Sequence, residues 1–136
     1  MTEEAQIQSV ALFYFFSLLD ESIARQATFS TIHKCQSRAR KLGLAEDKFP
    51  AIIVHCTNQL WERYRKIKVK GHASISYEAG WLLPESVDMG TWKEFQRESD
   101  PSEFLAVVWS QVLKLKDSDI SEGLGVTEGT VRHRVG

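Results

Sequence analysis

Apolar residues recur every three or four positions along most of this chain, which predicts helices. The first apolar run, residues 10–19, is about half as long as a membrane-spanning helix needs to be. Thr2 is placed to cap a helix here, and Glu3 and Glu4 suit the positive end of the helix dipole. We therefore expect a buried helix that ends near Asp20.

A second helix is predicted to follow a cap at Asp20 or Ser22 and to reach Leu42, with Gly43 ending it. Its apolar positions are Ile23, Ala27, Phe29, Ile32 and Ala39. These first two helices would form a hairpin.

A third helix is predicted from about Asp47 to Val69, because Pro50 suits a first helical turn. Its expected inward positions are Ile52, Ile53, Cys56, Leu60, Tyr64 and Ile67. Gly71 is the expected end of this helix.

From Gly71 to Ser99 the periodicity fades. We expect a linker that lies along the surface, anchored by Tyr77, Trp81 and Trp92, because such long connections are unusual inside a compact domain.

Another helix is predicted to start at Asp100 and Pro101, a capping residue followed by proline at the first helical position. The helix predicted over residues 102–115 would bury Leu105, Val108, Trp109, Val112 and Leu115. Asp117 or Ser118 would cap the next helix. The predicted fold is therefore all-α, with a three-helix lobe over residues 1–70, a linker over 71–99 and a helix-turn-helix lobe over 100–136.

The last residues predict a helix-turn-helix. Ile120 and Leu124 lie four positions apart, and Gly125 supplies the backbone freedom that a tight turn needs. Thr127 suits the cap of a second helix, in which Val131 would face inward. The expected outer side carries Glu128, Gly129, Thr130, Arg132 and His133. Such a helix can enter a major groove, although the same geometry also serves as plain scaffold.

Composition limits the function classes. The chain has 136 residues, 43% hydrophobic and 26% charged, which is typical of a soluble globular protein. Its formal charge is −1, so any basic surface is local. Two cysteines, Cys35 and Cys56, cannot form a secreted disulfide framework, and no signal peptide is recognisable, so a cytoplasmic location is expected.

Catalytic and metal chemistry is not predicted. His33 with Cys35, and His55 with Cys56, lack the spacing of structural zinc sites, so buried thiols are expected. No glycine-rich phosphate loop follows a strand, and no carboxylate pair suggests acid–base work. We expect no enzyme activity, no cofactor and no small-molecule substrate.

Residues 120–135 (ISEGLGVTEGTVRHRV) resemble the fourth conserved region of bacterial sigma factors, which docks on the upstream promoter element. The Gly-Thr-Val triplet after the turn is characteristic of the extracytoplasmic-function type. The DNA-binding residues that this resemblance implies are Thr127, Glu128, Thr130, Arg132, His133 and Arg134.

Residues 20–34 (DESIARQATFSTIHK) are similar to a helix of the second sigma region, which grips core RNA polymerase. The resemblance implies polymerase binding by Asp20, Gln26 and Phe29. Ile23 departs from the pattern, because active members usually carry an aspartate there.

Residues 58–66 (NQLWERYRK) lie where the family melts and holds promoter DNA. The residues implied for this role are Asn58, Trp61, Arg63, Tyr64, Arg65 and Lys66. Basic side chains would follow phosphates while Trp61 stacks on a base. An equally weighted interpretation makes Trp61 and Tyr64 core residues and the basic side chains a solvated face.

The expected function is that of a sigma-like initiation protein whose partners are core RNA polymerase, promoter DNA and an anti-sigma or other regulatory protein. The alternative is a sigma-like fold that serves as a protein-interaction adaptor, in a signalling or membrane-associated machine, without DNA binding. Ile23 and the slightly negative charge favour the alternative. A working recognition helix is also expected to continue beyond Gly136.

Overall fold

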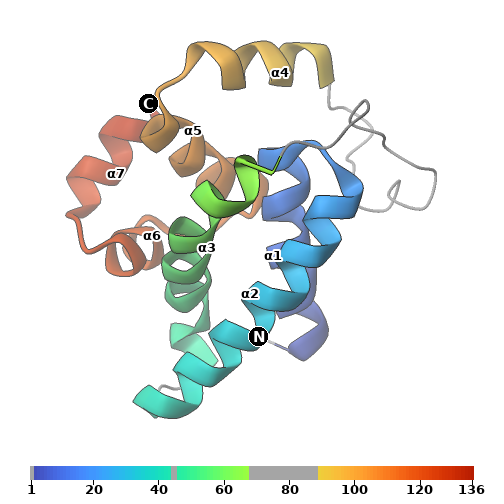
Figure 1. Ribbon diagram of the computed structural model, residues 1–136. Helices are drawn as coiled ribbons and strands as arrows, with labels where there is room; N and C mark the ends of the chain where they lie inside the picture. Colours follow the sequence, from blue (N-terminus) through green and yellow to red (C-terminus); the bar gives the residue numbers. More distant parts are fainter. Residues whose placement is uncertain (1, 44–45, 68–88) are drawn as a thin grey trace.

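The computed structural model describes residues 2–43, 46–67 and 89–136. Within these ranges every regular element is helical, which confirms the all-α prediction (Figure 1). The elements are α1 (Glu3–Leu18), α2 (Glu21–Leu42), the 3₁₀ turn η1 (Glu46–Lys48), α3 (Phe49–Arg65), α4 (Met89–Glu98), α5 (Pro101–Val107), the π-helical segment η3 (Val108–Val112), α6 (Asp117–Leu124) and α7 (Glu128–Val135). None of the helices in the described ranges combines the length and apolar character that crossing a membrane requires.

Side-chain caps set the boundaries of the first two helices where the sequence predicts them. The Thr2 hydroxyl accepts from the backbone N–H of Ala5 at 3.1 Å, and the Asp20 carboxylate accepts from that of Ile23 at 2.9 Å. Each bond satisfies a donor that a helix start leaves unpaired. Gly43 ends α2 at a φ of +61°, a backbone conformation that glycine adopts without strain.

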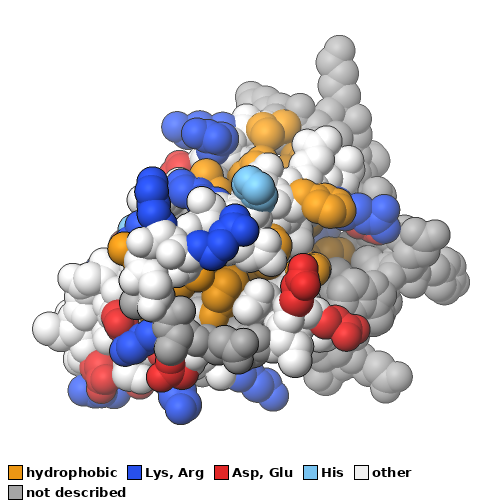
Figure 2. Space-filling model, turned by 90° about the horizontal axis from the view of Figure 1, so that it is seen from below, with side chains coloured by type: hydrophobic (Ala, Val, Ile, Leu, Met, Phe, Trp, Pro, Cys, Tyr) orange, Lys and Arg blue, Asp and Glu red, His pale blue; other side chains and the backbone are white. Residues whose placement is uncertain are grey.

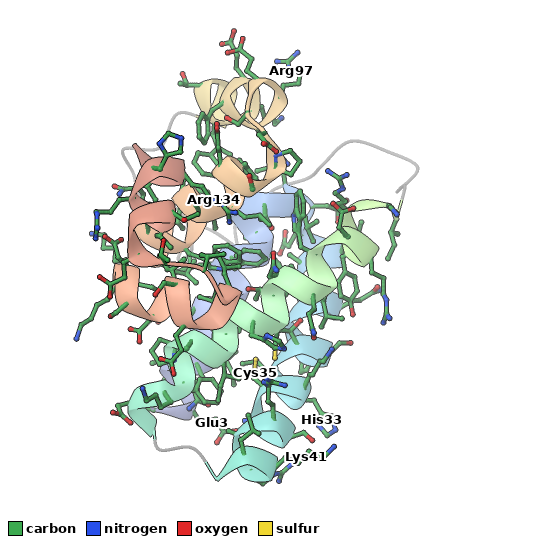
Figure 3. All side chains as sticks on the ribbon, turned by 90° about the vertical axis from the view of Figure 1, so that its left-hand side faces the viewer. Glu3, His33, Cys35, Lys41, Arg97 and Arg134 are labelled. Atoms are coloured by element: carbon green, nitrogen blue, oxygen red, sulfur yellow. The ribbon has the colours of Figure 1, made fainter. Side chains whose placement is uncertain are left out.

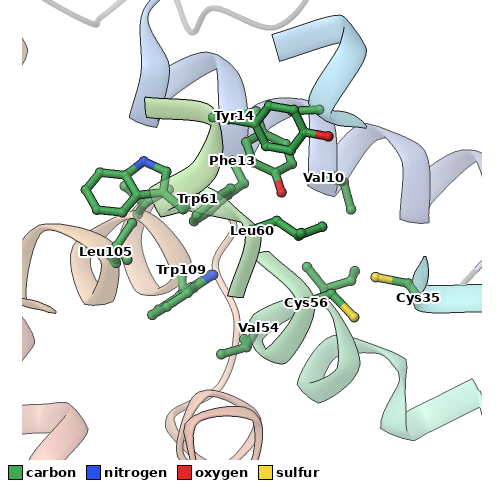
Figure 4. Close-up of a cluster of buried hydrophobic side chains, with 14 of the residues drawn as sticks. Val10, Phe13, Tyr14, Cys35, Val54, Cys56, Leu60, Trp61, Leu105 and Trp109 are labelled. Atoms are coloured by element: carbon green, nitrogen blue, oxygen red, sulfur yellow. The ribbon is translucent and has the colours of Figure 1, made fainter. Parts of the chain in front are cut away.

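One hydrophobic cluster holds most of the molecule together (Figure 4). Helix α3 packs against α1, α2 and α6, and α7 packs against α5 and α6. Buried residues from both predicted lobes share the cluster; fully buried examples are Val10, Phe13, Tyr14, Ile53, Val54, Val108, Ile120 and Val131. Residues from both predicted lobes therefore contribute to one shared core.

Cys35 and Cys56 are fully buried within this cluster, with Cys35 on α2 and Cys56 on α3 (Figure 4). A hydrogen bond with Cys56, together with burial, raises the pKa of the Cys35 thiol. The prediction that both thiols are buried is confirmed.

The predicted linker contains a helix, α4, which is a correction to the sequence analysis. On α4, the indole N–H of Trp92 donates to the backbone carbonyl of Phe16 at 2.7 Å. The side-chain amide of Gln96 donates to the backbone carbonyl of Ser17 at 2.9 Å. The Trp92 ring also lies 5.4 Å from that of Phe104. Trp92 therefore acts as an anchor, whereas Tyr77 and Trp81 lie outside the described residues.

Helix α3 ends at Arg65, earlier than the predicted Val69. Tyr64 is its last buried residue, and a tightened final turn joins the backbone N–H of Ile67 to the Tyr64 carbonyl at 3.1 Å. Ile67 is 45% exposed, so its predicted inward position is wrong. The apolar stripe stops one turn earlier than the spacing suggested.

The helix predicted over residues 102–115 is two segments, α5 and the π-helical η3. Asp100 caps α5, as predicted, by accepting from the backbone N–H of Ser102 at 3.4 Å. The helix closes before Lys114, whose φ is +56°. The predicted cap of α6 is wrong, because Lys116 occupies that position without a side-chain bond and Asp117 lies in the first turn.

Candidate nucleic-acid interface

The turn between α6 and α7 is held by backbone and side-chain hydrogen bonds. Gly125 adopts a φ of +71° and donates from its backbone N–H to the carbonyl of Ser121 at 2.9 Å. Val126 donates to the same carbonyl at 3.1 Å. The Thr127 hydroxyl then accepts from the backbone N–H of Thr130 at 3.2 Å, which caps α7. The predicted turn at Gly125 and the predicted start of the second helix at Glu128, capped by Thr127, are confirmed.

Two fully buried side chains anchor the helix-turn-helix to the core, Ile120 on α6 and Val131 on α7. Helix α6 also approaches α3 closely at Gly123, where an added Cβ would lie 2.5 Å from the Ala51 carbonyl oxygen and 2.6 Å from the Val54 Cβ. The position of α7 is thus set by packing against the core rather than by the turn alone.

Helix α7 carries the predicted polar residues, and Figure 3 shows its side chains with Arg134 labelled. Glu128, Arg132 and His133 are exposed, whereas Thr130 and Arg134 are half-buried. The Arg132 guanidinium lies 3.8 Å from the Glu128 carboxylate on the preceding turn. Arg132 and His133 are therefore accessible, but Glu128 competes with any phosphate for Arg132.

The helix-turn-helix is more acidic than basic. Its acidic residues are Asp117, Asp119, Glu122 and Glu128, and its arginines are Arg132 and Arg134. Positive potential is therefore confined to the C-terminal half of α7. Attraction to a phosphate backbone would act over a short range and would be sensitive to salt.

The predicted polymerase-binding residues lie at the N-cap and along the N-terminal half of α2. Asp20 is the helix cap, and Gln26 and Phe29 are exposed. Phe29 is 81% exposed, although it was among the apolar positions expected for this helix. Ile23 lies in the core, where an aspartate would carry a large desolvation penalty.

At the end of α3 the aromatic residues are buried and the basic ones are exposed. Trp61 is 3% exposed and Tyr64 is 9% exposed, so both rings belong to the core and the core interpretation of these two is supported. The predicted stacking of a DNA base on Trp61 is incompatible with this burial. Arg65 lies over the Trp61 ring at 4.8 Å and also pairs with Glu62 at 3.0 Å.

The remaining predicted residues on α3 and at its C-cap are exposed, namely Asn58, Arg63 and Lys66. They form the polar side of a helix whose buried first half faces α6. The predicted residues thus occupy three separate elements, α2, the end of α3 and α7.

The structure also brings together three residues that the sequence analysis did not single out for binding. Arg38 on α2, Lys48 on η1 and His55 on α3 line one pocket. Burial lowers the pKa of His55, and the charges of Arg38 and Lys34 lower it further, against the opposing effect of a hydrogen bond to the Gly123 backbone. No local motif could have identified this group, because its members come from three elements.

Comparisons with protein-family models, with curated proteins and with solved structures give no match to this chain.

Proposed function

We propose that this protein is a sigma-like transcription initiation factor that binds promoter DNA through α7 and core RNA polymerase through α2. The observation that carries the proposal is the capped turn that presents Arg132 and His133 on an accessible helix face. The resemblance of residues 120–135 to the fourth sigma region gives this face its proposed ligand.

In this mechanism residues 100–136 form the lobe that binds duplex DNA. The N-terminal turn of α7 enters the major groove, where Arg132 reaches a phosphate or a guanine edge. His133 and the half-buried Arg134 contact the flanking backbone. Because the surrounding residues are acidic, binding depends on these few cations.

Residues 1–70 form the second proposed lobe. The exposed Phe29 supplies an apolar contact to polymerase, and Gln26 beside it supplies hydrogen bonds. Arg63 and Lys66 follow the backbone of melted DNA. Trp61 has no part in this mechanism, because its ring is packed in the core.

Fluorescence anisotropy with duplex and bubble promoter DNA tests the DNA contact. Replacing Arg132 with alanine should weaken duplex binding. It should also reduce the magnitude of the slope of log binding constant against log salt concentration by about one. Arg97→Ala, on the exposed side of α4, is the matched control that should leave binding unchanged. Equal affinity of both variants and the unsubstituted protein at low salt would contradict the DNA contact.

The second candidate function is a protein-interaction adaptor without DNA binding. It is favoured by the acidic helix-turn-helix and by the exposed Phe29, which together suit a protein partner better than DNA. A pull-down of core RNA polymerase separates the two. Capture that Phe29→Ser abolishes supports the initiation factor, whereas no capture and no DNA binding by a folded sample supports the adaptor.

A further inference from the structure

A pocket of about 240 Å³ lies where the C-terminal half of α2, η1, the first turns of α3 and α6 meet. Figure 2 views the molecule from this end, where Lys and Arg side chains lie among hydrophobic ones. None of the described residues that line the pocket belongs to α7, so the pocket is distinct from the helix face proposed to bind DNA.

Most of the ionisable side chains that line the pocket are hydrogen-bond donors. Arg38 and Lys48 bring two positive charges, and His55 brings an imidazole. Of the described lining residues only Glu122 is acidic, and both of its carboxylate oxygens lie 3.4 Å from the Lys48 ammonium. Lys48 and Glu122 are each about half exposed, so this contact is weak and exchangeable.

The other side of the pocket is apolar. Leu42 and Ile52 line it, and Leu42 is 52% exposed, which leaves part of its surface without a protein neighbour. A ligand that fills this space would therefore gain from an uncharged, apolar group next to its charged one.

The wall formed by α6 is fixed in place. Gly123 permits the backbone of α6 to approach α3, and Gly123 and His55 both line the pocket. The site is thereby preorganised on helices rather than on a loop.

We propose that this pocket binds a small phosphomonoester, with the phosphate held by Arg38, Lys48 and His55 and its apolar substituent against Leu42 and Ile52. A phosphate offers three acceptor oxygens to three donor groups, where a carboxylate offers two. The anion would replace the Glu122 carboxylate at Lys48. This binding site is separate from the proposed DNA and polymerase contacts.

The test is a titration of the whole chain, followed by NMR of the His55 ring and of the backbone amides. The probes are phenyl phosphate, inorganic phosphate, benzoate and phenol. Phenyl phosphate should bind saturably and more tightly than the other three, with shifts centred on the pocket. Absence of saturation, or benzoate binding as tightly as phenyl phosphate, would overturn the proposal.

Variants locate the site. Arg38→Ala should weaken phenyl phosphate binding about tenfold, as expected for loss of one charge-assisted contact, and Lys48→Gln should also weaken it. Glu122→Gln should strengthen it by releasing Lys48. Lys41→Ala, on the same helix but outside the pocket, is the matched control and should bind like the original chain. Equal weakening by Lys41→Ala would show charge attraction without a site and overturn the proposal.

A competition experiment distinguishes a free phosphomonoester from the phosphates of a nucleic acid. Duplex DNA should leave phenyl phosphate bound, because a pocket of this size admits a terminal phosphate and excludes a duplex backbone. Displacement by DNA that persists in the Arg132→Ala variant would assign the pocket to nucleic acid and overturn the small-molecule assignment.

Discussion

The indole N–H of Trp109 donates to the hydroxyl of Thr57 at 3.0 Å in the buried interior. The same hydroxyl donates to the carbonyl of Ile53 at 2.6 Å, so the bond ties η3 directly to the backbone of α3. Trp109 also stacks on Phe13 of α1, with ring centroids 5.7 Å apart. One aromatic side chain from the C-terminal part of the chain is thus fixed by two helices of the N-terminal part.

Replacing Thr57 with valine should destabilise the protein. Valine keeps the shape of the side chain but leaves the Trp109 N–H buried without an acceptor, which costs about 1–3 kcal/mol. Urea unfolding monitored by circular dichroism measures the change in the free energy of unfolding. Thr28→Val is the control, because the one partner of the Thr28 hydroxyl among the described residues is the Ala24 carbonyl of its own helix, at 2.6 Å. Equal losses in both variants would contradict a specific role for the Trp109 bond.

Replacing Gly123 with alanine should move α6 away from α3. The new Cβ would lie 2.5 Å from the Ala51 carbonyl oxygen, a distance that the two backbones must relieve by separating. We expect a loss of about 1–3 kcal/mol in the free energy of unfolding.

The control for this substitution is Gly129→Ala on α7. Its new Cβ would meet nothing closer than 3.8 Å, and alanine favours helix over glycine by roughly 0.5–1 kcal/mol. Thermal unfolding should therefore show opposite shifts for the two variants. A stabilised Gly123→Ala protein would contradict the close approach of α6 to α3.

Sequence reasoning succeeded where structure depends on neighbouring residues. Thr2, Asp20, Asp100 and Thr127 all cap helices where they were expected to, because a cap needs only a short polar side chain and the N–H groups just after it. Gly125 ends α6 for a similarly local reason. The α6–α7 unit was predictable from its own residues.

The sequence alone could not decide the outcomes that depend on which surface a residue meets. Phe29 and Ile23 lie on the same helix, yet the fold buries Ile23 and exposes Phe29. Trp61 resembles a stacking residue in its local setting, but packing with Phe104 and Arg65 places it in the core. Helix α4 was missed because Trp92 and Phe95 are its main apolar anchors, which is too few for a periodic pattern.

The pKa of His55 should lie below its usual value of 6.5 in the folded protein. Burial and the positive charges of Arg38 and Lys34 disfavour the imidazolium there, and NMR titration of the ring measures the effect. Arg38→Gln should raise this pKa toward 6.5, whereas Lys41→Gln should have a smaller effect because Lys41 is not among the groups that lower it.

The same shift makes stability depend on pH. Below pH 6.5 the unfolded chain takes up the His55 proton before the folded protein does, so the free energy of unfolding falls until pH reaches the folded pKa. Urea midpoints of the original chain and of His55→Gln should therefore converge or cross as pH falls from 7.5. A difference between them that stays constant over this range would contradict the lowered pKa.

Replacing Glu128 with glutamine should strengthen DNA binding if α7 is the recognition helix. The carboxylate lies 3.8 Å from the Arg132 guanidinium, so its removal frees a cation and deletes a negative charge facing the phosphates. An exposed ion pair is worth roughly 0.2–1 kcal/mol, which corresponds to a gain of up to a few-fold in affinity at low salt. Glu94→Gln on α4 makes the same charge change away from α7 and should leave affinity unchanged. In the Arg132→Ala background the gain should shrink, and a full gain there would show that Glu128 acts on DNA independently of Arg132.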